Sequence, residues 1–311
     1  MFDDLPEPHP LDYDWRFNER SIKSIIVEAE KYNKICGLGV PSVIKKFDEI
    51  SRNAILIDRQ PLHSCKNKIT IDINIEKPID DLFECVLLDP PWYLNTFLRW
   101  ISWASIITQK GGIILCSLWP ENTRPIAKKE RSILFNWLST WSEFTIKKNY
   151  FEYKMPLFEK MARVSSQGTG NGSPLFGDLI SIKKKGIISL QPMINNKEEW
   201  VRFSFDNYQI AVRNNGHSAK IPHILKHPDA NGWIWPSVST RAIGRNKIDI
   251  WSSRNEVAIV DGNNELIQLL REINNQEERK ELFNSSFLFP FKEWDFSKIN
   301  FERRTEWLHL V

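Results

Sequence analysis

The chain has 311 residues, of which 41% are hydrophobic and 26% are charged, a composition typical of a globular protein with a packed core. Its net charge of +3 is too small to indicate nucleic-acid binding by itself, and no apolar stretch approaches the ~20 residues that span a bilayer. The four cysteines lack CxxC spacing, which favours buried free thiols in a reducing compartment, and the acidic, proline-rich start does not resemble a signal peptide. We therefore expect a cytoplasmic protein without a membrane segment.

Predicted strands alternate with predicted helices over the first part of the chain. Residues 1–18 are expected to form an N-terminal arm with Tyr13, Trp15 and Phe17 at alternating positions. Helical spacing of apolar residues predicts helices over 19–32, 41–50, 94–110 and 124–140. Short apolar runs predict strands from residue 35 and over 54–57, 69–73, 83–88 and 113–117, and an antiparallel pair over 144–153 and 179–184. This alternation predicts an α/β fold with a mainly parallel, doubly wound, Rossmann-like sheet.

The pattern changes beyond about residue 190. Alternating apolar residues predict a strand or hairpin over 200–212, and short strands are expected over 248–251 and 257–260. A helix is predicted over 263–273, whereas residues 287–311 are aromatic-rich and irregular. We therefore divide the chain into the arm, a sheet domain over 19–190, and a C-terminal α+β region of unknown role over 191–311.

The sequence Asp89-Pro90-Pro91-Trp92 directly follows the predicted buried strand over 83–88. Proline cannot continue a strand ladder, so a rigid turn should hold these residues at the carboxyl end of the strand, where α/β sheets bind ligands. The Asp89 carboxylate and the Pro90 carbonyl can accept hydrogen bonds from an amino group, and Trp92 or Tyr93 can stack on a flat target. This arrangement favours methyl transfer to an amino nitrogen; a tight turn after a core strand is the structural alternative.

Asp89–Trp92 resembles the Asp-Pro-Pro-aromatic signature of S-adenosylmethionine-dependent amino methyltransferases, notably the N6-adenine enzymes. In the mRNA adenosine methyltransferases the motif order is circularly permuted, so this chain does not match that family directly. Its motif order is more similar to a family first named adenine methyltransferase-like and later assigned to lysine methylation of elongation factors. The residues that carry this resemblance are Pro41-Ser42, Asp58, Asp72 with Asn74, and Asp89–Trp92. The resemblance implies a class I methyltransferase domain over roughly residues 19–185, with S-adenosyl-L-methionine as cofactor.

Candidate cofactor-binding residues precede this motif. Gly37 and Gly39 follow a predicted strand and would let the backbone approach the methionine part, while a helix starting at Pro41 would offer N–H groups to its carboxylate. Asp58 ends the next strand, where an acid commonly accepts the ribose hydroxyls. Asp72 is a candidate for contact with the adenine amino group, with Asp80 and Asp81 as alternatives. The third glycine of the dinucleotide fingerprint and a Walker motif are both missing, which disfavours nicotinamide and nucleoside-triphosphate binding.

Several other segments admit a functional and a structural interpretation. Trp119 is expected to help wall the target pocket, or else to be a core aromatic residue. The glycine-rich segment 167–177 is either a lid over the substrate or a solvated hairpin tip. A metal site at His223 and His227 is disfavoured, because no acidic or cysteine partner is near. The residues that together resemble a basic, aromatic nucleic-acid surface are Lys154, Lys160, Arg163, Lys183–Lys185, Tyr150, Phe151 and Tyr153.

Three functions stay open on the sequence. The first is an S-adenosylmethionine-dependent N-methyltransferase acting on N6 of adenine in DNA or RNA, with Asp89–Trp92 orienting the amine. The second keeps the fold and the cofactor but methylates a protein lysine. The third is a catalytically inactive, methyltransferase-like binding module. No metal is required by any of them, and the sequence leaves the oligomeric state open.

Overall fold

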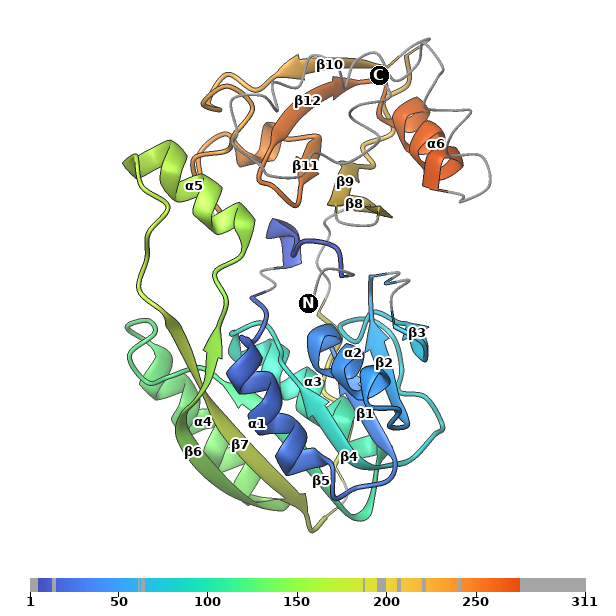
Figure 1. Ribbon diagram of the computed structural model, residues 1–311, viewed down its shortest axis with the longest axis vertical. Helices are drawn as coiled ribbons and strands as arrows, with labels where there is room; N and C mark the ends of the chain where they lie inside the picture. Colours follow the sequence, from blue (N-terminus) through green and yellow to red (C-terminus); the bar gives the residue numbers. More distant parts are fainter. Residues whose placement is uncertain are drawn as a thin grey trace.

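A seven-stranded sheet organises the first part of the chain (Figure 1). The computed structural model describes residues 5–12, 15–60, 62, 65–186, 188–194, 200–205, 208–219, 222–239 and 242–274. The strands are β1 (Ile35–Leu38), β2 (Ala54–Asp58), β3 (Lys68–Thr70), β4 (Phe83–Leu88), β5 (Thr108–Leu118), β6 (Ser142–Tyr153) and β7 (Leu175–Lys184). Their order is β3-β2-β1-β4-β5-β7-β6; β7 runs antiparallel to β5 and β6, and the other neighbouring strands are parallel. The predicted doubly wound sheet and its antiparallel strand pair are therefore confirmed.

Helices cover both faces of this sheet. α1 (Glu19–Ala29) and α2 (Pro41–Glu49) pack on one face with Ile35 and Leu87. α3 (Leu94–Ile107) and α4 (Ala127–Ser139) pack on the other face with Cys36 and Val86. Successive side chains of a strand point to opposite faces, so neighbouring residues such as Ile35 and Cys36 enter different layers. The result is a three-layer α/β/α domain with an apolar core on each side of the sheet.

One predicted boundary was wrong, and one helix was not predicted. Gly111 and Gly112 do not end the third helix: α3 stops at Ile107, and the glycines lie inside β5, where its register with β4 shifts. The segment before β7 contains a helix, α5 (Leu157–Gln167), that was not predicted. The glycine-rich segment is therefore shorter than expected, and it begins at Gly168, which ends α5 in the left-handed conformation.

A second sheet follows, as the change of pattern near residue 190 predicts. Its strands are β8 (Trp200–Phe205), β9 (Tyr208–Arg213), β10 (His223–Lys226), β11 (Ile250–Ser252) and β12 (Val257–Asp261), in the antiparallel order β10-β12-β11-β9-β8. The short 3-10 helix η2 (Arg245–Lys247) precedes β11, and α6 (Asn263–Asn274) lies against β8 and β9. The hairpin and the last helix are thereby confirmed, β10 was not predicted, and residues 287–311 lie outside the described residues. We keep the three-part division of the chain as a proposal.

The N-terminal arm contacts both sheets. Phe17 forms an antiparallel bridge with Tyr153 at the end of β6. On the other side, the Nε2 atom of His9 lies 2.8 Å from the Trp251 carbonyl oxygen in β11. Between these contacts, the 3-10 helix η1 (Pro10–Asp12) carries Asp12, which forms ion pairs with Arg59 after β2 and with Arg202 in β8. The arm therefore joins the two sheets, whereas Tyr13 lies outside the described residues.

Because His9 is buried, we expect the free energy of unfolding to depend on pH. Burial, together with the charge of Arg202, lowers the pKa of His9 to about 3, although Asp12 opposes this shift and Arg59 adds to it. An unfolded histidine has a pKa of about 6.5, so between these values the unfolded chain binds a proton that the native chain does not. The contribution of His9 to the free energy of unfolding is therefore fully present above about pH 6.5. It should fall by about 1.4 kcal/mol for each pH unit below that value. Urea denaturation at several pH values measures this slope.

The matched control for this prediction is His9→Gln, whose amide can keep the contact with the Trp251 carbonyl but does not titrate. We expect its stability to vary less steeply between about pH 6.5 and pH 4 than that of the wild type. Equal slopes in the two proteins would contradict the prediction.

All four cysteines are buried and free, as predicted. Burial raises the pKa of Cys85 to about 12 and, with a contribution from Asp48, that of Cys65 to about 11. Thiolates are the reactive form of cysteine, so these side chains are poor nucleophiles. Of the helices in the described part of the chain, none combines the length and the apolar character needed to cross a membrane.

Candidate functional site

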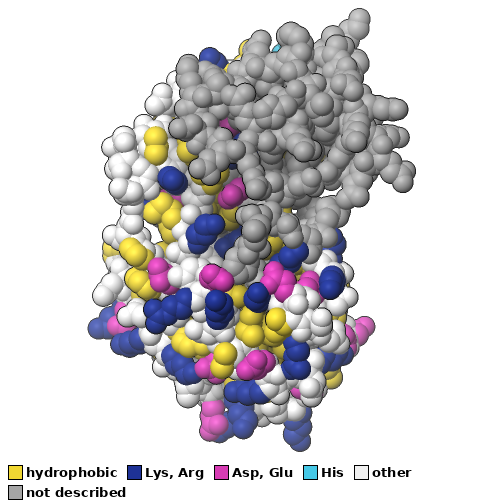
Figure 2. All heavy atoms as spheres, in the orientation of Figure 1, with side chains coloured by type: hydrophobic (Ala, Val, Ile, Leu, Met, Phe, Trp, Pro, Cys, Tyr) yellow, Lys and Arg dark blue, Asp and Glu magenta, His cyan; other side chains and the backbone are white. Residues whose placement is uncertain are grey.

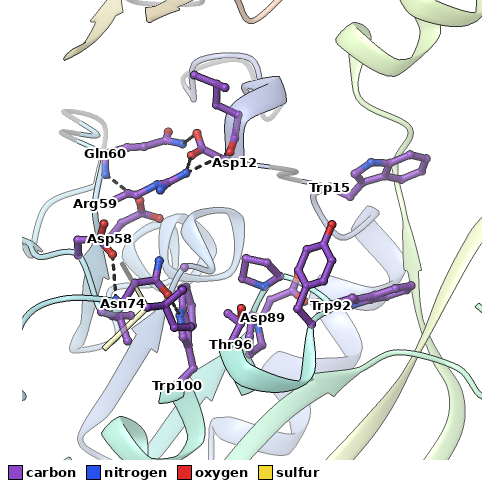
Figure 3. A pocket seen from close by; sticks show the side chains of 18 of the residues that line it. Asp12, Trp15, Asp58, Arg59, Gln60, Asn74, Asp89, Trp92, Thr96 and Trp100 are labelled. Atoms are coloured by element: carbon purple, nitrogen blue, oxygen red, sulfur yellow. Dashed lines mark hydrogen bonds and ion pairs between the residues drawn. The ribbon is translucent and has the colours of Figure 1, made fainter. Parts of the chain in front are cut away.

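A cavity of about 390 Å³ lies at the carboxyl ends of β1, β2, β3 and β4 (Figure 3). These ends converge because the chain runs outward from β1 to β3 and then returns to β4 on the other side of β1, which creates the crevice where α/β sheets bind ligands. Its volume falls within the range of small-molecule sites, roughly 300–1,000 Å³. The predicted site residues that line it are Gly39, Pro41, Asp58, Asp72, Asp89, Pro90, Pro91, Trp92 and Tyr93.

Two predicted site residues lie elsewhere. Gly37 is inside β1, where a Cβ atom would stand 2.6 Å from the Cγ1 atom of Ile44, so the glycine is needed for the packing of α2 on the sheet. Trp119 is fully buried, and its ring meets that of Phe97 edge-on with centroids 4.3 Å apart. Neither residue lines the cavity, and their packing supports the structural interpretation of both.

The bend after β1 requires glycine at position 39. Gly39 has a φ of +63°, and a Cβ atom there would lie 2.8 Å from the Cη2 atom of Trp100 in α3. Its N–H donates to the Ile57 carbonyl at 3.0 Å, which ties the bend to β2. α2 begins two residues later at Pro41. The close approach of Trp100 and the left-handed backbone together exclude a side chain at the floor of the cavity.

Gly39→Ala is expected to destabilise the fold and to weaken cofactor binding. The left-handed conformation alone costs about 1–2 kcal/mol for a residue with a Cβ atom, and displacement of Trp100 adds to this. Gly111→Ala is the matched control, because Gly111 has a φ of +82° but no neighbour within 4 Å of its Cβ position. Urea denaturation should show a larger loss of folding free energy for Gly39→Ala than for Gly111→Ala, and calorimetry with S-adenosylmethionine a larger loss of affinity. Equal losses in the two variants would mean that the Trp100 contact is unimportant.

Polar side chains form the wall at the end of β2. The Oδ1 atom of Asp58 accepts a hydrogen bond from the Gln60 N–H at 2.9 Å. The Gln60 side chain and Arg59 both donate to Asp12 of the arm, which Arg202 also contacts at 2.7 Å. Burial would raise the pKa of Asp12, but Arg202 and Arg59 outweigh it and lower this pKa to about 2. Asp12 is therefore a carboxylate at neutral pH, and the arm is held closely against the predicted ribose-binding acid.

Beyond β3, the chain turns around Asp72. The Oδ1 atom of Asp72 accepts from the Asn74 N–H at 2.9 Å, and the Oδ1 atom of Asn74 accepts from the Trp100 indole N–H at 2.9 Å. Ile71 and Ile73 also line the cavity. This end therefore combines apolar surface with carboxylate and amide groups, which suits a heterocyclic base.

Asp89 lies in the middle of the cavity, beside the glycine bend and directly after β4 (Figure 3). Its Oδ1 atom accepts a hydrogen bond from the Tyr153 hydroxyl at 2.8 Å. Pro90 is buried, and Pro91, which has no N–H, follows its carbonyl group. The Pro91 carbonyl accepts from the Tyr93 N–H at 2.7 Å, which completes a tight turn into α3. The carboxylate thus faces the same cavity as the glycine bend and has a hydroxyl partner.

Aromatic side chains form the wall beside Asp89. Trp92 is half-buried, and its ring meets that of Tyr153 edge-on with centroids 5.6 Å apart. Tyr93 is 51% exposed, and the guanidinium of Arg124 lies 5.9 Å from its ring centroid. Figure 3 shows Trp15 and Trp92 on the side opposite Asp58 and Arg59, with Asp89 between the two sides. The cavity therefore has a polar end and an aromatic end.

The predicted basic, aromatic surface does not form as one unit. Phe151 and Tyr153 are buried, and β7 starts beside Tyr153 but ends beside Ser142. Lys183–Lys185 therefore lie about 30 Å from the α5 end of this strand pair. On the face shown in Figure 2, Lys and Arg are interspersed with Asp and Glu on the part of the surface that is not grey.

Sequence reasoning missed residues that reach the cavity from distant segments. Asp12 and Trp15 come from the arm, Trp100 from the second turn of α3, and Tyr153 from the end of β6. Trp92, Thr96 and Trp100 are spaced four residues apart, which is close to the helical repeat. The position of Trp100 near the turn could therefore have been predicted. No local pattern would have indicated the others.

Comparison with known proteins adds evidence on the fold alone. No protein-family model and no curated protein sequence matches the chain. Branched-chain polyamine synthase from Thermus thermophilus, in complex with N4-aminopropylspermidine and 5′-methylthioadenosine, is similar with a TM-score of 0.51 and 10% identity. The match covers 61% of this chain and 64% of the synthase, which is less than two thirds of that protein.

Methyltransferases are also among the similar structures. The N-methyltransferase NodS from Bradyrhizobium japonicum, in complex with S-adenosyl-L-homocysteine, has a TM-score of 0.35 and 8% identity over 54% of this chain and 86% of its own. The plantazolicin methyltransferase BpumL, also in complex with S-adenosyl-L-homocysteine, has a TM-score of 0.34 and 10% identity over 54% and 80%. Together with the observed strand order, the similarity at TM-score 0.51 shows that the first sheet and its helices form a Rossmann-like α/β fold.

Proposed function

We propose that the protein is an S-adenosylmethionine-dependent N-methyltransferase that modifies N6 of adenine in a nucleic acid. The observation that supports this most is the shared cavity: the Gly39 bend and Asp58, expected to hold the cofactor, and Asp89–Trp92, expected to hold the amine, line the same space. Methyl transfer by direct displacement needs donor and acceptor in one water-poor site, and no covalent enzyme intermediate.

The residues at the polar end fit the cofactor. The glycine bend brings the backbone close to the cavity, and the N-terminus of α2 offers backbone N–H groups to a carboxylate. Asp58 would accept hydrogen bonds from the ribose hydroxyls, and Trp100 with Asp72 and Asn74 would offer an apolar face and polar edges to an adenine ring. S-adenosylmethionine supplies an electrophilic methyl group on a sulfonium when it is bound.

Loss of Asp58 should weaken cofactor binding. A hydrogen bond to a charged group contributes about 1.5–3 kcal/mol, which corresponds to roughly a 10- to 150-fold change in Kd. We expect Asp58→Ala to show a weakening of this size by calorimetry with S-adenosylmethionine. Asp80→Ala, the same change at an exposed site outside the cavity lining, should bind like the wild type. Unmeasurable binding by the wild type would favour the inactive binding module.

The residues of the turn after β4 fit a planar amine. The Asp89 carboxylate and the Pro90 carbonyl would accept the two hydrogens of an amino group, which leaves the nitrogen lone pair to face the methyl donor. Trp92 or Tyr93 would stack on the extruded base, as enzymes that modify bases commonly require. These groups orient the amine and increase its nucleophilicity.

Lysine methylation is the second candidate, because the motif order resembles that of the elongation-factor lysine methyltransferases. Radiolabelled S-adenosylmethionine incubated with nucleic acid and with protein extracts, followed by nuclease or protease digestion, separates the two functions. Label released as methylated adenine supports the proposal, and label released as methyllysine overturns it in favour of the second candidate.

A further inference from the structure

Two buried hydroxyl groups form a chain that ends on Asp89. The Tyr153 hydroxyl oxygen lies 2.8 Å from the Oδ1 atom of Asp89 and 2.5 Å from the Oγ atom of Ser117. Ser117 belongs to β5 and Tyr153 to β6, so three different strand ends supply the chain. Ser117 is 1% exposed and Tyr153 5% exposed, whereas Asp89 is half-buried and lines the cavity.

The direction of the hydrogen bonds follows from the number of protons. A carboxylate can only accept, so the one hydroxyl proton of Tyr153 is donated to Asp89. The short contact with Ser117 then requires the Ser117 hydroxyl to donate to the Tyr153 oxygen. Each hydroxyl in the chain therefore donates towards the carboxylate, and donation by Ser117 strengthens donation by Tyr153.

The ring of Tyr153 is held in place from two sides. Phe17 of the arm packs against it with ring centroids 4.9 Å apart, and Trp92 meets it edge-on. Burial and the nearby charge of Asp89 raise the pKa of Tyr153 well above its usual value, although Ser117 opposes this shift. The phenol therefore stays protonated and remains a hydrogen-bond donor at any pH at which the protein works.

We propose that Tyr153, supported by Ser117, is a positioning residue that holds the Asp89 carboxylate in the orientation that receives the target amine. This inference rests on the proposed function, since it assigns to Asp89 the role given above. The chain ends at the buried Ser117, so it orients Asp89 and does not carry a proton to solvent. The hydrogen bond from Tyr153 fixes a direction of the Asp89 carboxylate, and a shift in that direction would misplace the amine.

Tyr153→Phe removes the hydroxyl and keeps the ring. We expect kcat for methyl transfer to an adenine-containing oligonucleotide to fall at least about 10-fold, the effect of losing one hydrogen bond to a charged group, while the Kd for S-adenosylmethionine is unchanged. The fall of kcat on the acid side should also begin at a higher pH, because the ionised form of Asp89 loses a stabilising hydrogen bond. Ser117→Ala should lower kcat and shift the acid side of its pH profile in the same directions as Tyr153→Phe, but by smaller amounts.

Tyr150→Phe is the matched control. Tyr150 is also on β6, and its hydroxyl donates to the Ser24 carbonyl at 2.9 Å, outside the cavity lining. This variant should keep the kcat and the pH profile of the wild type. In an Asp89→Ala background, Tyr153→Phe should cause no further loss, because a residue that acts through Asp89 has nothing left to position.

The outcomes separate this inference from the proposed function. If Asp89→Ala is inactive but Tyr153→Phe keeps wild-type kcat and pH profile, Asp89 acts alone and the positioning role is rejected. If the wild type methylates no adenine, the proposed function fails, and a direct readout still tests the hydrogen-bond chain. A slowly exchanging hydroxyl proton should then be seen by NMR, be absent from Tyr153→Phe, and shift in Asp89→Asn; its absence from the wild type would reject the chain.

Discussion

Replacing Asp89 by alanine is expected to lower kcat for methyl transfer by about 10²- to 10³-fold, the effect of removing one preorganised polar contact from an active site. The loss has a physical reason: without the carboxylate, one hydrogen of the amine has no acceptor and the nitrogen lone pair is no longer directed at the methyl donor. Affinity for S-adenosylmethionine should be unchanged, since the Asp89 side chain is assigned to the amine, whereas the acids assigned to the cofactor, Asp58 and Asp72, come from the end of β2 and from the turn after β3. Labelled methyl transfer and calorimetry measure the two quantities.

The control for this experiment is Asp80→Ala, which removes an exposed carboxylate outside the cavity lining. It should have wild-type turnover. Retained turnover in Asp89→Ala would remove the basis for assigning the motif to the target amine, whatever the cofactor affinity.

The second large effect is expected at Arg131, a buried cation of α4. Its NH1 atom donates to the Asp178 carboxylate at 2.8 Å and to the Trp119 carbonyl at 2.6 Å, and the two charged side chains are only 3% and 5% exposed. Arg131→Met would leave a buried carboxylate without its cation. We expect the free energy of unfolding to fall by about 3–5 kcal/mol, measured by urea denaturation.

Two further variants test the cause of this loss. Asp178→Asn combined with Arg131→Met removes the stranded charge and keeps an acceptor for the Asn149 N–H, so it should be more stable than Arg131→Met alone. Arg163→Met breaks a more exposed pair with Glu159 within α5 and should cost less than about 1 kcal/mol. Similar losses at Arg131 and Arg163 would show that burial of the ion pair is not the cause.

Much of the first sheet could be predicted because its signals are local. A buried strand appears as a short apolar run, and an amphipathic helix appears as apolar residues at helical spacing, so β1 to β4 and α1 to α4 were found with small errors at their ends, whereas β5 begins at Thr108 inside the predicted helix. α5 was missed although Phe158, Met161 and Ala162 recur at helical spacing in its sequence, because the segment was left unassigned next to the glycine-rich residues that follow it. Its C-terminal glycine, Gly168, was a further signal.

The residues of the candidate site also include some that local sequence patterns predicted and some that they did not. Gly39, Asp58, Asp72 and Asp89–Trp92 each follow a strand in the sequence, and parallel strands bring their carboxyl ends to one edge of the sheet, so their convergence was predictable. Gly37 was expected at the cavity but does not line it: a glycine inside a strand can serve packing as well as ligand approach, and the sequence does not show the position of Ile44.

Local patterns in the sequence were therefore enough to predict the alternation of strands and helices, the turn after β4, and the chemistry available at the strand ends. The distant groups that complete the site become apparent in the folded chain: Asp12 meets Arg59 and Arg202 across 47 and 190 residues, and Tyr153 meets Asp89 across 64. The physical reason is that hydrogen bonds and ion pairs are set by distances in space. Short-range periodicity describes which face of an element is buried, but not which partner the folded chain brings to it.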